Sequence, residues 1–212
     1  MGAGYQLQVH ELSPCGLRRV SMRICCAVLL CVVPVAALAQ PVEPFDAMSK
    51  LNFHAQSVGS PWSLAETAAY AAILHGLDSP REWGQGAGAY GKRFASTLGA
   101  SSIHGALAFG LDSTLHQDPR YFRSRDTGFL RRTAHAFRGT ILTRTDRGGE
   151  TLSTWRLGSD YGAAFLANQW YPARLNTARQ GAINGSLRLG FDFASNLGIE
   201  FWPDIRRWVR RR

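Results

Sequence analysis

The chain has no cysteine after position 31. Its four cysteines, Cys15, Cys25, Cys26 and Cys31, all lie near the N-terminus of the 212 residues. Everything downstream therefore lacks disulfides, thiolate metal ligands and cysteine nucleophiles. This excludes disulfide-stapled scaffolds and thiol enzymes for the greater part of the chain.

Long hydrophobic runs are also missing, apart from one near the N-terminus. Three arginines precede an apolar run over 24–38, which ends in Ala37, Leu38 and Ala39 before Gln40. A basic segment, a short apolar segment and small residues at a cleavage point are typical of a secretory signal peptide. The run is too short to span a bilayer. We therefore predict a signal peptide over 1–39 and a periplasmic, envelope-associated or secreted protein.

Acidic residues and lysine are scarce. The 24 basic residues outnumber 15 acidic ones, the formal net charge is +9, and only Lys50 and Lys92 are lysines. A GC-rich genome would produce the same arginine bias, but arginine also binds phosphates and carboxylates through its planar guanidinium. Outside the cytoplasm the anionic partners are membrane surfaces and acidic envelope polymers, and we expect no nucleic-acid partner.

Turn and cap signals divide the chain into segments of helical length and predict an all-α fold. We expect six helices, over 63–76, 81–99, 101–116, 126–142, 153–170 and 177–202. They would form one compact bundle over 61–203, packed through Gly, Ala and Ser. A flexible lead-in over 40–60 would precede it, and a basic amphipathic tail over 204–212 would follow Pro203.

Local patterns assign several helix ends and faces. Ser63 and Glu66 form a capping box, and Asp126 is expected to cap the fourth helix. The apolar stripe of that helix comprises Phe129, Leu130, Ala134, Phe137 and Ile141. The second helix carries a stripe of small residues, and this stripe predicts a close approach by another helix. It comprises Gly84, Gly88, Gly91, Ala95 and Gly99.

Residues 184–201 fit two patterns. Apolar residues alternate with polar ones from Leu187 to Phe193, as in a strand, whereas polar residues recur every four positions from Asn184 to Glu200, as on one helix face. We favour the helix, because such alternation is absent elsewhere. An Arg188–Asp192 pair would lie on this face. This face and polar residues of the preceding helix together predict a polar seam, which either sets helix register or lines a cavity. The seam residues are Asp160, Asn168, Asn184, Arg188, Asp192 and Asn196.

Most catalytic motifs are missing. The chain has no HExxH pair, no Gly-x-Ser-x-Gly elbow and no glycine-rich phosphate loop after a strand. The remaining candidate for metal-assisted hydrolysis is a cluster of His104, Asp112, His116 and Asp118. The alternative to a metal site is structural: these residues would cap a helix end and include a histidine hydrogen-bonded in the core. We expect no cofactor.

Two basic segments could bind an anionic group. Arg120, Arg123 and Arg125 surround Tyr121 and Phe122 in the loop 116–125, where they either hold an anion or anchor the loop. After Pro203, an amphipathic turn combines arginines with a tryptophan, as at a membrane surface. Its predicted binding residues are Arg206, Arg207, Trp208, Arg210 and Arg211.

Four segments of the chain are distinctive: Tyr90-Gly91-Lys92-Arg93, the run HQDPRYFR from His116, Thr143-Arg144-Thr145-Asp146, and the run EFWPDIRR from Glu200. Together they resemble a family of secreted proteins from Gram-negative environmental bacteria that has no assigned activity. The resemblance covers about residues 60–207 and implies an exported helical domain. It implies no mechanism.

The sequence thus favours a non-enzymatic protein that touches anionic lipid or polymer at the cell envelope through its arginines. The alternatives are the metal-assisted hydrolase and a bundle that binds a ligand in a polar cavity. Oligomeric state stays open.

Overall fold

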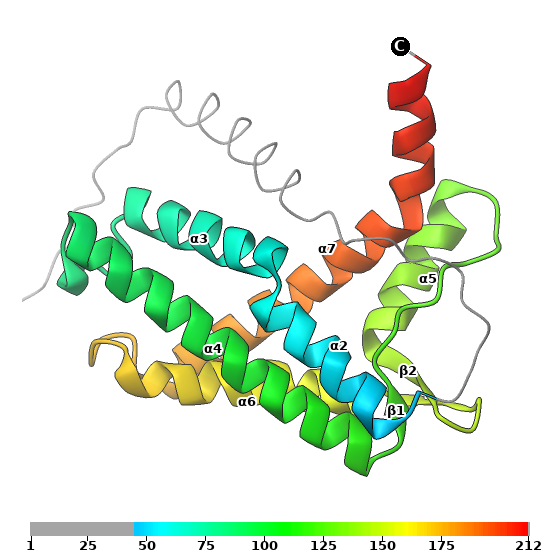
Figure 1. Ribbon diagram of the computed structural model, residues 1–212, viewed down its shortest axis with the longest axis horizontal. Coiled ribbons are helices and arrows are strands. Elements are labelled where there is room, and N and C mark those ends of the chain that lie inside the picture. The colour runs from blue at the N-terminus through cyan, green and yellow to red at the C-terminus, as the bar shows by residue number, and fades with distance from the viewer. Residues whose placement is uncertain (1–44, 212) are drawn as a thin grey trace, which may run out of the picture. The chain divides into compact units, whose positions relative to one another are not determined.

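Helices make up most of the part of the chain that the structure describes. The computed structural model describes residues 45–211 (Figure 1), so the predicted signal peptide lies outside the described residues. The α-helices are α2 (Ala47–Gly59), α3 (Pro61–Gly76), α4 (Ala87–Thr114), α5 (Phe129–Ile141), α6 (Thr154–Ala167) and α7 (Ala178–Arg210). Short 3₁₀ turns are η1 (Arg81–Trp83) and η2 (Asn168–Trp170). The prediction of a compact all-α bundle is confirmed.

A small antiparallel sheet joins α4 to α6. Its strands, in the order β1-β2-β3, are β1 (Gln117–Asp118), β2 (Leu142–Thr145) and β3 (Glu150–Leu152). Gln117 pairs with Thr145, and Leu142 pairs with Leu152. The turn predicted at 145–149 is therefore a hairpin turn, with Gly148 at a positive φ of 87°.

Side-chain caps fix the starts of three helices. Asp46 accepts a hydrogen bond from the Ser49 amide at α2, and Thr177 accepts one from the Gln180 amide at α7. At α3 the cap is Ser60, which accepts from the Ser63 amide. The predicted capping box at Ser63 is therefore wrong, because Pro61 opens the helix two residues earlier. The predicted cap at Asp126 is also wrong, since α5 begins after Gly128 without a side-chain cap.

Three predicted boundaries need correction. Most of the lead-in is helix α2, because Lys50 and His54 are buried along it. The second predicted helix begins only at Ala87, because Gly84 and Gly86 have positive φ and separate it from η1. From there it is continuous with the third as α4, because Gly99 lies mid-helix without the left-handed φ that ends a helix. The tail belongs to α7, which continues through Pro203 to Arg210. Its last turns run in a different direction from the rest (Figure 1), as expected where proline removes a helical hydrogen bond.

Small residues allow close packing, but not where the sequence predicted it. Helix α4 packs against α2, α3 and α6, while α7 packs against α6 and α5. A Cβ on Gly158 or Gly162 would meet α4 leucines within 3 Å, and one on Gly181 or Gly185 would meet α6 rings within 3 Å. The predicted contact stripe fails at Gly84, Gly88 and Gly91, since nothing lies within 4 Å of a Cβ there.

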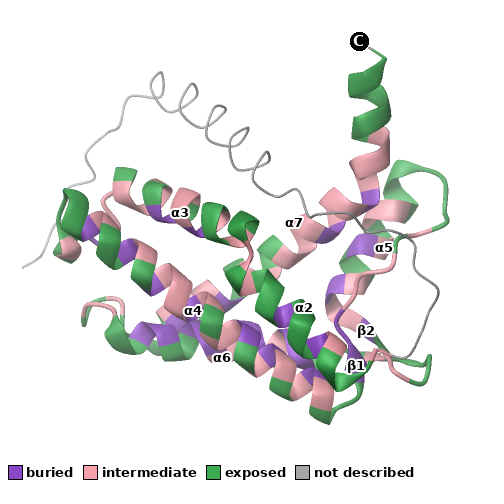
Figure 2. Cartoon of the chain, in the orientation of Figure 1, coloured by how far each residue is buried: buried purple, intermediate pink, exposed green. Residues whose placement is uncertain are grey.

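The interior is unusually polar. Apart from Trp155 and two prolines, the buried apolar side chains among residues 45–211 are all alanines. They share the interior with charged side chains such as Arg93, Asp112 and Glu200, and Figure 2 shows where the buried positions lie along the helices. Large apolar side chains are exposed on several helices. No helix within residues 45–211 combines the length and hydropathy needed to cross a bilayer.

Candidate functional site

A buried carboxylate holds α5 in place. Glu200 of α7 is fully buried and accepts hydrogen bonds at 3.0 Å from the Tyr121 hydroxyl, the Ser124 amide and the Arg132 guanidinium. Arg132 also pairs with Asp204. Burial raises the pKa of Tyr121, and the neighbouring Glu200 charge raises it further, so the phenol stays a donor. The cluster joins the loop before α5, α5 itself and α7.

Further polar contacts fix the same face of α5. Thr140 accepts a hydrogen bond from the Asn196 amide at 2.9 Å, and His135 lies 2.9 Å from the Phe122 carbonyl. Arg156 of α6 donates to the Thr140 carbonyl at 3.1 Å. Buried polar groups need such partners, so the polar face of α5 must point inward.

The apolar stripe of α5 consequently faces outward. An apolar stripe normally covers the core, but here Phe129, Leu130 and Phe137 are 69%, 79% and 58% exposed. Two of these rings contact rings of α7, with centroid distances of 5.3 Å for Phe129–Phe201 and 5.7 Å for Phe137–Phe193. The contacts join the two helices into one apolar strip.

Helix α7 extends this strip to the C-terminus. Apolar residues recur every four positions from Phe193 through Phe201, and Ile205, Trp208 and Val209 are exposed beyond Pro203. We define the apolar part of the "α5–α7 surface" as Phe129, Leu130, Phe137, Phe193, Phe201, Ile205, Trp208 and Val209.

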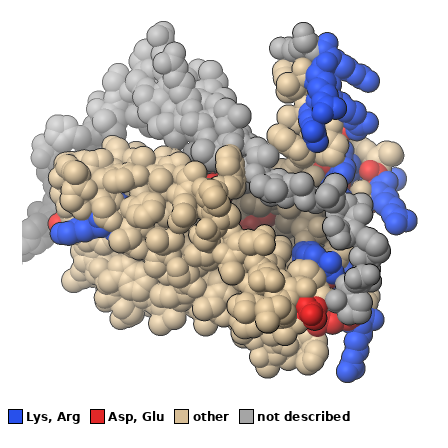
Figure 3. All heavy atoms as spheres, in the orientation of Figure 1, with Lys and Arg blue, Asp and Glu red and all other residues tan. Residues whose placement is uncertain are grey.

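Arginines border this surface. Basic side chains gather over the last turns of α7 and around α5, whereas the visible face over α3 and most of α4 is neutral (Figure 3). Arg207 pairs with Asp204, and Arg138 pairs with Glu150, in exposed ion pairs. The basic part of the α5–α7 surface comprises Arg123, Arg125, Arg131, Arg206, Arg207, Arg210 and Arg211, all exposed.

The structure separates the three arginines of the loop before α5. Arg120 turns back onto Asp118 at 2.7 Å and lies over the rings of Phe45 and Phe122, so it anchors the loop. Arg123 and Arg125 are exposed. Arg120 therefore takes the anchoring role that the sequence allowed, and anion binding by Arg123 and Arg125 stays a prediction.

The residues of the predicted metal cluster do not come together. His104 lies 3.1 Å from Asp160, whereas Asp112 lies 2.6 Å from His54. Eight residues of helix rotate Asp112 about 80° away from His104, so the two face different neighbours. His116 is exposed, at a positive φ beyond the end of α4. Within residues 45–211, no three His, Cys, Asp or Glu side chains are placed to hold a metal.

The fourth member, Asp118, pairs with Arg120. The prediction of a shared metal cluster is therefore wrong for all four residues.

Part of the predicted polar seam is present, with a different central pair, whereas Asn196 bonds to Thr140 of α5. Asn184 donates to Asn168 at 3.2 Å, linking α7 to η2. Asp192 pairs with Arg156 of α6 at 2.9 Å, so the predicted pair with Arg188 is wrong. No local pattern indicated Arg156, because its partner lies on another helix.

Burial raises the pKa of Asp192 to about 6, against the attraction of Arg156 and with a further contribution from Asp160. Asp160 is buried, contacts His104 and leaves Oδ2 without a hydrogen-bond partner. The seam thus brings the carboxylates of Asp160 and Asp192 close together, beside His104 and Arg156, between α4, α6 and α7.

Comparison with known proteins gives no relative: no family model, curated protein or solved structure matches this chain.

Proposed function

We propose that this protein binds peripherally to anionic lipid membranes through the α5–α7 surface. The observation that carries the proposal is the orientation of α5, whose polar face is bound inward by Glu200 and Asn196 while its phenylalanines and Leu130 face outward. An outward apolar stripe bordered by cations is the pattern of helices that lie in the membrane interface.

The apolar residues supply the burial term. Full burial of a Phe or Leu side chain is worth about 1.5–3 kcal/mol, and partial burial in the headgroup layer contributes less for each. Tryptophan favours this layer because its ring is apolar and its N–H is polar, which suits Trp208 near the end of α7.

The arginines supply the charge term. Each cation near an anionic leaflet contributes about 1 kcal/mol. Arg206, Arg210 and Arg211 lie on the same turns as the exposed Ile205 and Val209, so both terms act at the same end of α7. Export by the predicted signal peptide would bring the surface to the cell envelope.

Sedimentation with vesicles tests the proposal. The purified chain should sediment with vesicles of phosphatidylcholine and phosphatidylglycerol, and less with phosphatidylcholine alone. Binding should weaken as salt rises, because exposed charges are screened beyond about 8 Å at physiological ionic strength. Equal binding to both kinds of vesicle would refute the proposed contribution of the arginine charges to binding.

A matched pair of leucines isolates the surface. Leu130→Gln, on α5, should weaken vesicle binding at every salt concentration, because it removes burial and not charge. Leu77→Gln is the control, since Leu77 is also strongly exposed (63%) but lies after α3. Equal effects of the two substitutions would refute the assignment to α5–α7. A Leu130-dependent self-association without vesicle binding would instead identify a second copy as the occupant.

A further inference from the structure

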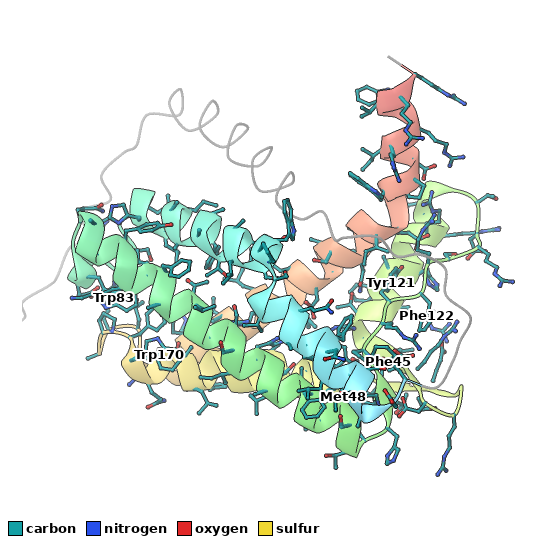
Figure 4. All side chains as sticks on the ribbon, viewed as in Figure 1. Phe45, Met48, Trp83, Tyr121, Phe122 and Trp170 are labelled. Atoms are coloured by element: carbon teal, nitrogen blue, oxygen red, sulfur yellow. The ribbon has the colours of Figure 1, made fainter. Side chains whose placement is uncertain are left out.

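A second surface feature lies beside α4, distinct from the α5–α7 surface. It is a groove of about 690 Å³ lined by Trp83, Trp170, Ile103 and small residues of α4, with Lys92 at its margin. Figure 4 shows the two tryptophans beside the N-terminal half of α4. The volume falls in the range of small-molecule sites.

The aromatic walls are held in place without a ligand. The Trp170 indole N–H donates to the Ser96 hydroxyl at 2.8 Å, and Trp83 stacks on Tyr171 with a centroid distance of 5.2 Å. The Trp170 ring therefore lines the groove with its polar N–H already hydrogen-bonded, and the Trp83 ring is held by its stacking on Tyr171. A preformed wall lowers the entropy that binding must overcome.

The floor is one face of α4. Lys92, Ala95, Ser96, Gly99 and Ile103 recur at helical spacing along the groove. Ala95 and Gly99 leave room, since a Cβ added to Gly99 would only reach ordinary contact, 4.0 Å from Trp170. The stretch from Lys92 to Ile103 is about 16 Å long. This suits an extended, narrow, apolar ligand.

Charge lies only at one end of this floor. Lys92 is exposed and has no carboxylate paired with it among residues 45–211, while the floor toward Ile103 is apolar or small. A ligand that complements a cation at one end and an apolar floor beyond it has an anionic head and a single apolar chain. We propose that the groove binds a fatty-acid-like amphiphile, with its carboxylate at Lys92 and its chain between Trp83 and Trp170.

Titration with decanoate below its micelle concentration tests this site on the full chain. Calorimetry should show saturable binding, and a bromine-labelled decanoate should quench tryptophan fluorescence. Ala95→Leu fills the groove and should lower affinity at least about tenfold, which corresponds to 1.4 kcal/mol. Ala65→Leu is the control, because Ala65 is an exposed alanine on α3 that does not line the groove.

The head group is tested separately. Lys92→Gln, an exposed substitution that should not affect folding, should weaken decanoate binding several-fold and leave decanol binding unchanged. The absence of saturable binding, or unchanged binding by Ala95→Leu, would overturn the site. Equal effects of Lys92→Gln on decanoate and decanol would overturn the carboxylate contact. Leu130→Gln should leave decanoate binding intact, which distinguishes this groove from the proposed membrane surface.

Discussion

Replacing Glu200 by glutamine should test what holds α5 against α7. The substitution keeps the shape of the side chain but removes its charge. Glu200 accepts three hydrogen bonds, one of them from the guanidinium of Arg132, and both side chains are strongly buried, at 0% and 13% exposed. Glutamine presents one acceptor and one donor group, so its NH₂ would face another donor.

The expected loss is about 3 kcal/mol in the free energy of unfolding. A hydrogen bond to a charged group is worth about 1.5–3 kcal/mol, and removing one partner of a buried ion pair costs about 3–5 kcal/mol. The lower end applies because Arg132 keeps Asp204 as a second partner. The control is Glu150→Gln, which breaks the exposed Arg138 pair, with side chains 61% and 52% exposed. It should change stability by no more than about 0.5 kcal/mol.

Urea unfolding followed by far-ultraviolet circular dichroism measures both variants. The midpoint of Glu200→Gln should fall while its m-value stays near that of the wild type, since the same surface is exposed on unfolding. If the two variants lose the same stability, the buried cluster is not what orients α5. The structural basis of the proposed membrane surface would then fail with it.

Three further predictions concern other parts of the chain. Because the pKa of Asp192 is raised to about 6, the free energy of unfolding should fall as pH rises from about 4 to 6. Urea unfolding at a series of pH values measures this dependence, and Asp192→Asn should make it flatter. An unchanged pH dependence in the variant would show that another group titrates. Gly185→Ala should destabilise the protein by about 1–3 kcal/mol, because its Cβ would meet the Tyr161 ring at 2.5 Å. Gly190→Ala is the control: nothing lies within 4 Å of its Cβ, so it should be neutral or stabilising by up to about 1 kcal/mol. Thermal unfolding that ranks the two variants otherwise would contradict this packing. Intact-mass analysis of exported protein should give an N-terminus at Gln40, and retention of residues 24–39 would refute cleavage.

Sequence signals worked best where structure depends on neighbours along the chain. The start of α7 follows from the cap at Thr177, and the turn at 145–149 follows from its glycines. The all-α class follows from the same local patterns. Local rules failed at Pro203, where α7 continues, because contacts of the flanking residues outweigh one lost backbone hydrogen bond. Asp204 and Glu200, on either side of the proline, both pair with Arg132.

The candidate surface shows the limit of such signals. The spacing of Phe129, Leu130 and Phe137 established that α5 has an apolar face, but a helical pattern cannot say which way that face points. Only the tertiary structure decided this, by placing Glu200 opposite Arg132, 68 residues away. A buried charge needs a partner within the fold. An apolar stripe can instead be covered by a membrane or a second molecule. The position of this partner, which no local pattern encodes, turned the apolar face of α5 outward.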